Sequence, residues 1–356
     1  MRIEELKLIN YRNFKSLNLS FDKINFFYGK NGVGKTNIVE AIAYLTNLSS
    51  FRKVEDKDII NSNASFFTIE AKFRQESNIY HVKVIYSNKG KKVVVNDKIV
   101  RRKQDYLSQF VTVCFTPQDV FLFKDAKQVR RDFLNDEIVK ISPVYYVSLS
   151  SFNKVLKNRN DLLKQDIIDF NLLNVYTTMI SKYSLEIIKK RYEFIKELEF
   201  YTNQKYKELT NSDDEIKIEY ETFVKEDEIN EETILIKLNE SLEEDKRKRV
   251  TNIGIQKDDF TVYLNGNKIA NYGSQGQNRL ASIAIKLAMI EIASKKTGDR
   301  PIVILDDVLS ELDQEKQKNL LNYVKKESQV FLTSTKLIDC TCKIFAINSV
   351  GIKEEK

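Results

Sequence analysis

The sequence predicts an α/β protein with a parallel core sheet, an antiparallel β subdomain and an inserted helical arm. Three observations carry this prediction. Residues 24–28 (INFFY) are typical of a strand, and a glycine-rich loop and a helical pattern follow them. Residues 65–115 hold short segments rich in β-branched and aromatic residues. Residues 120–210 contain no glycine, a single proline and apolar residues at helical spacing.

The N-terminal part of the chain alternates between strand and turn signals. Residues 3–9, 16–21 and 24–28 alternate as strands do, and a helix is predicted from Lys35 to Leu48. Within residues 65–115 the break at 96–98 (Asn-Asp-Lys) indicates a hairpin. The single histidine, His81, lies in an alternating strand pattern, which makes a multi-histidine metal site improbable and a structural role the simpler interpretation.

In the remainder of the chain, the pattern of apolar residues changes from helical spacing to strand-like alternation. A stripe of apolar residues along 172–209 predicts a helix roughly 50 Å long at 1.5 Å per residue. Residues 216–223 read as a strand, Asn265-Gly266 as a hairpin turn, 277–295 as a helix, and 301–305 and 329–335 as buried strands. We therefore expect residues 1–119 and 211–356 to form one head, with 120–210 as an inserted arm.

Composition limits the cellular setting. The chain has 356 residues and a net charge of +7, with no apolar run long enough to span a bilayer. Its N-terminus lacks the apolar core of a signal peptide. We expect a cytoplasmic protein without membrane association. The positive charge permits nucleic-acid binding but does not require it.

The loop after residue 28 has the pattern G-x-x-x-x-G-K-[ST]. Between a strand and a helix, this pattern turns backbone N–H groups and the helix dipole toward a phosphate. We expect Lys35 to reach the β- and γ-phosphates of ATP, and the Thr36 hydroxyl to bind Mg²⁺. The predicted loop consists of Gly29, Lys30, Asn31, Gly32, Val33, Gly34, Lys35 and Thr36.

A second motif supplies carboxylates. Residues 301–305 (PIVIL) form an apolar strand that ends at Asp306 and Asp307. Ligands of open α/β sheets bind at the carboxyl ends of the strands. Asp306 is therefore the expected Mg²⁺ ligand, and Asp307 the group that orients or deprotonates an attacking water. The simpler alternative is a pair of helix-capping carboxylates.

A third motif narrows the class of nucleotide-binding protein. Ser274-Gln275-Gly276-Gln277 opens a helix about thirty residues before the carboxylates, and Ser310 and Asp313 follow them. These stretches resemble the signature motif and the D-loop of ABC-type ATPases, which implies the P-loop ABC-type head fold. In that superfamily the signature loop covers the γ-phosphate bound by a partner subunit, which implies a homodimer closed by ATP. The alternative is an ordinary N-capping turn.

Further sequence blocks resemble the RecF family of bacterial recombination mediators along nearly the whole chain. The matching blocks, in order, are NYRNF (10–14), CFTPQDVFLF (114–123), RRDFLN (130–135), KNRNDLLK (157–164), YGSQGQNRLASIAIKLA (272–288) and ILDDVLSELD (304–313). The resemblance implies binding of duplex DNA near a gap or a single-strand/double-strand junction, and partnership with RecR, with RecO and RecA downstream. It also implies slow, DNA-dependent ATP hydrolysis that acts as a switch in DNA repair, replication and the SOS response.

Two stretches depart from the family's pattern. Gln118 stands where the family usually has Glu, at the place of the Q-loop glutamine of ABC-type ATPases, so it is a candidate catalytic residue or a surface polar residue. Residues 254–259 read G-I-Q-K-D-D where the family usually has G-P-H-R-D-D. Arg12 resembles an arginine that reaches nucleotide phosphate in related heads, and a surface arginine is an equal alternative.

Several basic clusters are candidate DNA contacts, each with a solvated surface as the alternative. They include Arg101, Arg102, Arg130, Arg131, Lys246 and Arg247. Three rival functions stay open at this point: an ATP-gated protein-binding scaffold, a small-molecule P-loop kinase, and an SMC-like defence ATPase.

Overall fold

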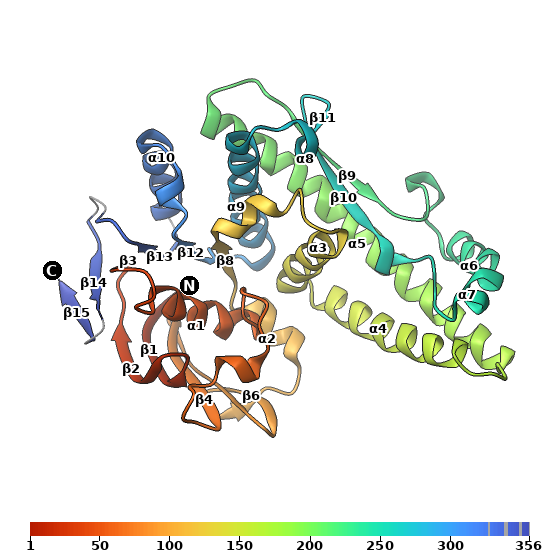
Figure 1. Cartoon of the computed structure of the whole chain (residues 1–356), viewed down its shortest axis with the longest axis horizontal. Helices are drawn as coiled ribbons and strands as arrows, with labels where there is room; N and C mark the ends of the chain where they lie inside the picture. The colour runs from red at the N-terminus through yellow and green to blue at the C-terminus, as the bar shows by residue number, and fades with distance from the viewer. Residues whose placement is uncertain (327, 338–340, 349–350, 356) are drawn as a thin grey trace. The chain divides into compact units, whose positions relative to one another are not determined.

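The computed structural model describes residues 1–326, 328–337, 341–348 and 351–355. Its internal contacts divide the chain into two compact units, residues 1–119 with 289–356, and residues 120–288 (Figure 1). By these contacts the segment 211–288 groups with the helical arm. The division into 1–119, 120–210 and 211–356 stays a prediction about domains.

The first unit contains a six-stranded, mostly parallel sheet in the order β15-β14-β3-β13-β12-β8. Its strands are β3 (Ile24–Tyr28), β8 (Thr112–Phe115), β12 (Ile302–Asp306), β13 (Val330–Ser334), β14 (Lys343–Ile347) and β15 (Ile352–Glu355). All neighbours pair in parallel except β14 with β15. Strands β12 and β13 are buried along their whole length, as expected for parallel strands covered on both faces. The carboxyl ends of β3, β13, β12 and β8 therefore share one edge.

Helices of the first unit connect these strands. They are α1 (Lys35–Asn47), α2 (Lys103–Gln109), α10 (Gln314–Lys325) and the short 3₁₀ turns η1 (Asp56–Ile59), η2 (Pro117–Phe121) and η5 (Leu309–Glu311). Helix α2 lies where the sequence suggests only strands, and β14 and β15 follow the strand expected to be the last. Both errors concern short elements, whose apolar pattern does not distinguish them from loops.

The same unit holds an antiparallel sheet in the order β2-β1-β4-β5-β6-β7. Its strands are β1 (Arg2–Tyr11), β2 (Phe14–Ser20), β4 (Phe66–Gln75), β5 (Asn78–Ser87), β6 (Gly90–Val95) and β7 (Lys98–Ile99). The predicted hairpin is confirmed: Asn96 and Asp97 both have positive φ, 46° and 63°, as a two-residue type I′ turn requires. His81 lies on β5 with its side chain exposed.

The second unit is a helical arm with a small sheet. Its helices are α3 (Lys127–Ile141), α4 (Pro143–Leu163), α5 (Phe170–Thr210), α6 (Glu231–Glu240), α7 (Leu242–Lys248) and α8 (Ile269–Tyr272), with 3₁₀ turns η3 (Glu226–Glu228) and η4 (Ile255–Lys257). Strands β9 (Ile216–Glu221), β10 (Asp259–Leu264) and β11 (Asn267–Lys268) are antiparallel. Helix α9 (Gln275–Thr297) begins in this unit and continues past residue 288.

The predicted long helix is confirmed as α5, a single helix of 41 residues that packs alongside α4 (Figure 1). The Asp169 side chain accepts hydrogen bonds from the backbone N–H groups of Asn171 and Leu172, which caps its N-terminus. Asn211 ends it in the left-handed conformation. At 1.5 Å per residue this helix is about 60 Å long.

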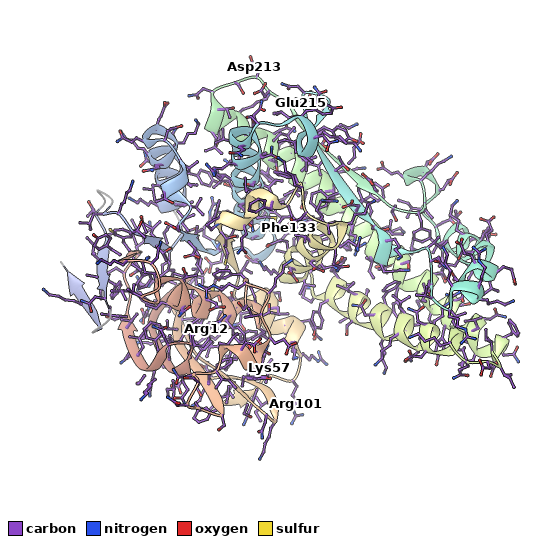
Figure 2. All side chains as sticks on the ribbon, viewed as in Figure 1. Arg12, Lys57, Arg101, Phe133, Asp213 and Glu215 are labelled. Carbon is purple, nitrogen blue, oxygen red and sulfur yellow. The ribbon has the colours of Figure 1, made fainter. Side chains whose placement is uncertain are left out.

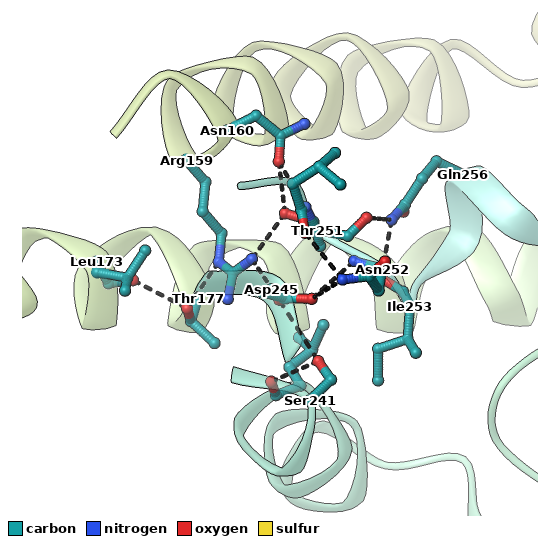
Figure 3. Close-up of polar contacts among 12 residues, drawn as sticks. Arg159, Asn160, Leu173, Thr177, Ser241, Asp245, Thr251, Asn252, Ile253 and Gln256 are labelled. Atoms are coloured by element: carbon teal, nitrogen blue, oxygen red, sulfur yellow. Dashed lines mark hydrogen bonds and ion pairs between the residues drawn. The ribbon is translucent and has the colours of Figure 1, made fainter. Parts of the chain in front are cut away.

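A buried ion pair joins three parts of this arm (Figure 3). Arg159 of α4 and Asp245 of α7 are fully buried and lie 2.8 Å apart. The Arg159 guanidinium also donates to the hydroxyls of Thr177 on α5 and Thr251. The family-like block at 157–164 is therefore a structural one, since its arginine holds α7 against α4 and α5.

Within the part of the chain that the structure describes, no helix is both long and apolar enough to cross a membrane.

Candidate nucleotide-binding site

The glycine-rich loop has a backbone that its glycines make possible. Gly32 and Gly34 have φ of 82° and 109°, in the left-handed region, and Gly34 is the N-cap of α1. A Cβ on Gly29 would lie 2.2 Å from the carbonyl oxygen of Ile347 on β14. The loop therefore joins β3 to α1 in the geometry that the motif predicts, at the carboxyl edge of the core sheet.

Lys35 lies over this loop. Its side chain is almost buried, and its Nζ donates to the carbonyl oxygens of Gly29 and Lys30 at 2.7 and 2.8 Å. Burial lowers the pKa of the Lys35 ammonium, while the nearby carboxylates of Asp307 and Asp306 oppose that shift. A phosphate in the loop would offer this ammonium a charged partner in place of the two carbonyls.

Thr36 and Asp306 meet as the motifs predict. The Thr36 hydroxyl donates to Asp306 Oδ1 at 2.9 Å, and the hydroxyl of Thr333 on β13 donates to the same oxygen at 2.7 Å. Burial raises the pKa of Asp306, and the two hydroxyl donors counteract that shift. The pair offers one hydroxyl and one carboxylate, the oxygen ligands that Mg²⁺ prefers.

Asp307 has a strained backbone. Its φ is 53°, a left-handed conformation that costs a non-glycine residue about 1 kcal/mol. Its backbone N–H donates to both the carbonyl and the hydroxyl oxygen of Thr333, at 3.2 and 3.0 Å. Its Oδ1 is buried and has no hydrogen-bond partner among the described residues. Such an oxygen fits a role toward a water or a cation that the nucleotide brings.

The oxygen donors present therefore fit a magnesium ion. Among the described residues, no group of three or more His, Cys, Asp and Glu forms a metal cluster. Thr36 and Asp306 would hold the ion, with phosphate oxygens and waters completing its shell. This is the usual arrangement for Mg²⁺ at nucleotide sites.

Gln118 lies at the same sheet edge. It is exposed in η2, immediately after β8, and β8 pairs in parallel with β12, which ends at Asp306. Neither of its open interpretations, catalytic residue or surface residue, is decided by this placement.

Arg12 is engaged within the unit. It donates to both carboxylate oxygens of the buried Glu40 on α1, at 2.9 and 2.6 Å, and to the carbonyl of Asp58. Ser50 also donates to Glu40, and Arg52 lies 3.8 Å from it. In the described arrangement, Glu40 therefore holds Arg12 at the side of α1 (Figure 2).

Arg52 is a site residue that the sequence did not indicate. Its guanidinium donates to Asn37 Oδ1 at 3.1 Å, on the turn of α1 that follows Thr36. Its charge opposes, to a smaller extent than the two hydroxyl donors, the rise that burial causes in the pKa of Asp306. No local motif marks it, because its contact with Asn37 arises only when the chain folds back onto α1.

The signature stretch is an exposed helix start with several hydrogen bonds of its own. The Ser274 hydroxyl accepts from the backbone N–H of Gln277 at 3.2 Å, and Gln277 Oε1 accepts from the Ser274 N–H at 2.9 Å. These reciprocal bonds form a capping box. Asn278 Nδ2 adds bonds to the carbonyls of Gly273 and Ser274, both at 2.9 Å. The capping alternative is thus correct as local structure, while Ser274, Gln275 and Gly276 remain exposed.

The residues predicted as the D-loop follow Asp307 directly. The Ser310 hydroxyl donates to the Asp307 carbonyl at 2.8 Å, and Asp313 caps α10 by accepting from the Lys316 N–H at 2.9 Å. Hydrogen bonding to Lys316 lowers the pKa of Asp313. Ser310 thus stabilises the turn that carries the acidic pair, and Asp313 stabilises the start of α10.

The candidate DNA contacts divide into two groups. Arg101 and Arg102 are exposed, and Figure 2 shows Arg101 at the surface of the β-rich part of the first unit. Lys246 and Arg247 are close to glutamates of their own helix, Glu243 and Glu244.

Arg130 and Arg131, by contrast, form hydrogen bonds to other residues of the second unit. Arg130 forms a two-pronged ion pair with Asp259 at 2.7 and 2.9 Å, and Arg131 donates to the Asp258 carbonyl at 3.0 Å. The divergent stretch 254–259 is accordingly structural at its end, because Asp258 also pairs with the buried Arg191 at 2.7 Å. These bonds engage both guanidiniums within the second unit, and the expectation that Arg130 and Arg131 contact DNA stays a prediction.

Comparisons with known proteins agree with this geometry. A family model described as RecF/RecN/SMC N terminal domain matches residues 2–341. A DNA replication and repair protein RecF from Halalkalibacterium halodurans is 37% identical over 347 residues, covering 94% of this chain and 93% of the relative. Another, from Streptococcus suis, is 35% identical over 365 residues and covers 100% of both chains.

Solved structures give the same result. A structure of the recombination mediator protein RecF with ATP, in the RecFOR pathway, aligns with a TM-score of 0.93 at 29% identity, covering 99% of this chain and 97% of that one. An Smc head domain from Pyrococcus furiosus aligns with a TM-score of 0.55 at 16% identity, covering 99% and 95%, and shares the fold alone.

Proposed function

Because the chain belongs to the RecF family, we propose that it is an ATP-dependent DNA-binding protein of recombinational repair and replication restart. ATP closes a homodimer of ABC-type heads on duplex DNA near single-strand gaps. Slow hydrolysis then resets the dimer, so the protein is a weak DNA-dependent ATPase and its ATPase activity is a switch. The proposed setting is the cytoplasm.

The observation that carries the proposal is the exposed, hydrogen-bonded signature loop. A capping box and two Asn278 bonds fix the conformation of the loop. Ser274 and Gly276 stay exposed at the positive end of α9, a helix of 23 residues. A helix N-terminus with an exposed hydroxyl suits an anion. We assign this loop to the γ-phosphate held by the glycine-rich loop of a second subunit.

The residues at the sheet edge have separate roles in ATP hydrolysis. Lys35 and the loop N–H groups bind the phosphates. Thr36 and Asp306 would hold Mg²⁺, which would stabilise the developing charge on the phosphate oxygens. Asp307 orients and deprotonates the attacking water through Oδ1, the carboxylate oxygen that has no hydrogen-bond partner within the described part of the chain. We assign Gln118 an assisting role at that water. The carboxyl end of β13 holds Thr333 and Ser334 and no histidine, so we expect slow turnover.

The DNA surface follows from the distribution of charge. Basic residues outnumber acidic ones by eight over residues 1–119, whereas the rest of the chain is nearly neutral. Six exposed basic side chains lie on or beside β6, β7 and α2, and within the described residues none of them joins an ion pair. We call this set the basic ribbon; it consists of Lys89, Lys92, Lys98, Arg101, Arg102 and Lys103.

The basic ribbon would contact the phosphate backbone without reading sequence, so binding should be strongly salt-dependent. Exchange of Arg101 and Arg102 for glutamate should weaken duplex binding at least tenfold and reduce its salt dependence. The matched control is the exchange of Lys246 and Arg247, whose charges are balanced locally by Glu243 and Glu244. Equal losses from both exchanges would refute the assignment of the ribbon.

The proposed partners follow from the family. RecR binds the ATP-closed form, and RecO acts with it to load RecA onto single-stranded DNA. The relatives support this proposal by their names, DNA replication and repair proteins and a mediator of the RecFOR pathway.

Light scattering with and without ATP tests the proposal. The wild-type protein should be a dimer with ATP and a monomer without it. Ser274→Arg should keep ATP binding and lose the dimer. Asn230→Arg is the matched control, because Asn230 also caps an exposed helix of the second unit, accepting from the Thr233 N–H at 2.8 Å. A monomer with bound ATP in the wild-type protein would refute the proposal and favour a small-molecule kinase.

Two other candidates have distinct outcomes. A protein-binding scaffold would dimerise with ATP yet show no salt-dependent DNA binding. A defence ATPase of the SMC-like type would cleave nucleic acid.

A further inference from the structure

Thr333 occupies a position between the two motifs of the nucleotide site. It is buried on β13, the strand that lies between β3 and β12 in the core sheet. The parallel register places it opposite Asp306 on one side and Phe27 on the other. Its side chain therefore lies between the strand that leads to the glycine-rich loop and the strand that ends in the acidic pair.

The Thr333 hydroxyl acts on both acidic residues at once. It donates its proton to Asp306 Oδ1 at 2.7 Å and accepts the backbone N–H of Asp307 at 3.0 Å. Only a group that is both donor and acceptor satisfies the two bonds. The three residues before Thr333 on β13 are apolar (VFL) and the whole strand is buried. A buried hydroxyl here is costly unless it is paired, and these two bonds pair it.

Each bond has a distinct consequence. The first fixes the Asp306 carboxylate, since Oδ1 also accepts from Thr36 and is held between two hydroxyls. The second helps to hold Asp307 in its left-handed conformation, with φ at 53°. In that conformation Asp307 Oδ1 has no hydrogen-bond partner among the residues that the structure describes.

We propose that Thr333 is a positioning residue for ATP hydrolysis: its single hydroxyl sets the orientation of the Mg²⁺-binding carboxylate and of the carboxylate that acts on the attacking water. This inference rests on the proposed function. The Thr333 hydroxyl, on the strand beside β12, bonds to both Asp306 and Asp307. The orientation of one carboxylate therefore depends on the orientation of the other.

Three variants test the assignment. Thr333→Val keeps the shape and removes both bonds, and Thr333→Ser keeps the hydroxyl. Thr112→Val is the matched control, because Thr112 is also a fully buried threonine of the core sheet, at the start of β8 and thus at the opposite end of that strand from the site. Removing a residue that orients a metal ligand usually costs about 10- to 100-fold in metal affinity or activity.

Two measurements test the proposed role of Thr333. The first is the Mg²⁺ concentration that half-saturates binding of a fluorescent ATP analogue, followed without hydrolysis. The second is the separation of kcat from KM for ATP. Thr333→Val should raise the Mg²⁺ midpoint and lower kcat by at least about tenfold, with KM nearly unchanged. Thr333→Ser should stay within about threefold of the wild type, and Thr112→Val should change neither quantity.

A Thr333→Val protein with wild-type Mg²⁺ midpoint and kcat would overturn the inference. If that variant does not fold, Thr333→Ala and Thr333→Ser decide by the same measurements, and equal losses in both would also overturn it. A wild-type protein that binds ATP as a monomer would remove the proposed function, but the Mg²⁺ midpoint would still test the role of Thr333.

Discussion

The buried pair of Arg159 and Asp245 makes the sharpest prediction about stability. Arg159→Met keeps the length of the side chain and removes three bonds: to Asp245 at 2.8 Å, to Thr251 at 2.7 Å and to Thr177 at 3.1 Å. Asp245 would stay buried, with bonds to the N–H and Nδ2 of Asn252 at 2.8 and 3.0 Å but no cation. Removing one partner of a buried ion pair costs about 3–5 kcal/mol.

The assay is thermal unfolding by calorimetry, with the transition of the second unit as readout. At about 2–4 °C for each kcal/mol in a domain of this size, the midpoint should fall by about 10 °C. Arg247→Met is the control; Arg247 is exposed and near Glu244, so it should cost less than about 0.5 kcal/mol.

The double variant Arg159→Met with Asp245→Leu separates charge from packing. It removes the unpaired carboxylate and should recover a large part of the loss, because replacing a whole buried pair by apolar groups is often nearly neutral. The reasoning is refuted if Arg159→Met costs less than about 1 kcal/mol, or if the double variant is as unstable as the single one.

Three further predictions concern the first unit. Gly29→Ala should lower stability by about 2 kcal/mol and weaken ATP binding, because its Cβ would meet the Ile347 carbonyl at 2.2 Å. The control is Gly90→Ala, where φ is 93° and the added Cβ meets open space, so only backbone strain of about 1 kcal/mol is expected. Chemical denaturation measures both losses of stability. Asp307→Asn should keep ATP binding and dimerisation but lower kcat at least about 100-fold, and a smaller loss in single-turnover assays would exclude Asp307 as the base. Hydrogen bonding to Arg74 lowers the pKa of Glu4 from 4.5 to about 2, so its stabilisation is full above pH 4.5 and is lost as the pH falls toward 2. Between pH 4.5 and 2, the stability of Glu4→Gln should therefore fall less steeply with decreasing pH than that of the wild-type protein. The difference in stability should be under about 1 kcal/mol because the pair is near solvent. An unchanged dependence of stability on pH would contradict the pairing.

The sequence predicts the site better than it predicts the connections that support it. The glycine-rich loop and the Asp306 strand are recognisable because their function requires fixed spacing between glycines, a lysine and a carboxylate. The roles of Thr333 and Arg52 depend on strand register and on the return of the chain to α1, which spacing does not encode.

The interpretation of Arg130 and Arg131 shows a second limit. Two adjacent arginines look alike whether they face solvent or carboxylates, and their partners Asp259 and Asp258 lie more than 120 residues away in the chain. The type I′ turn at Asn96 and Asp97 was predictable for the opposite reason, because its conformational requirement is local.

The central claim is that one ATP is bound by the glycine-rich loop of one subunit and the signature loop of another. Mixing two defective variants tests it directly. Lys35→Ala removes the phosphate contact but keeps the signature loop, and Ser274→Arg does the reverse. Light scattering with ATP should find each variant monomeric alone and a dimer in the mixture, where one complete site forms between unlike subunits. A mixture that stays monomeric while the wild-type protein dimerises, or a Ser274→Arg protein that dimerises alone, would contradict the claim.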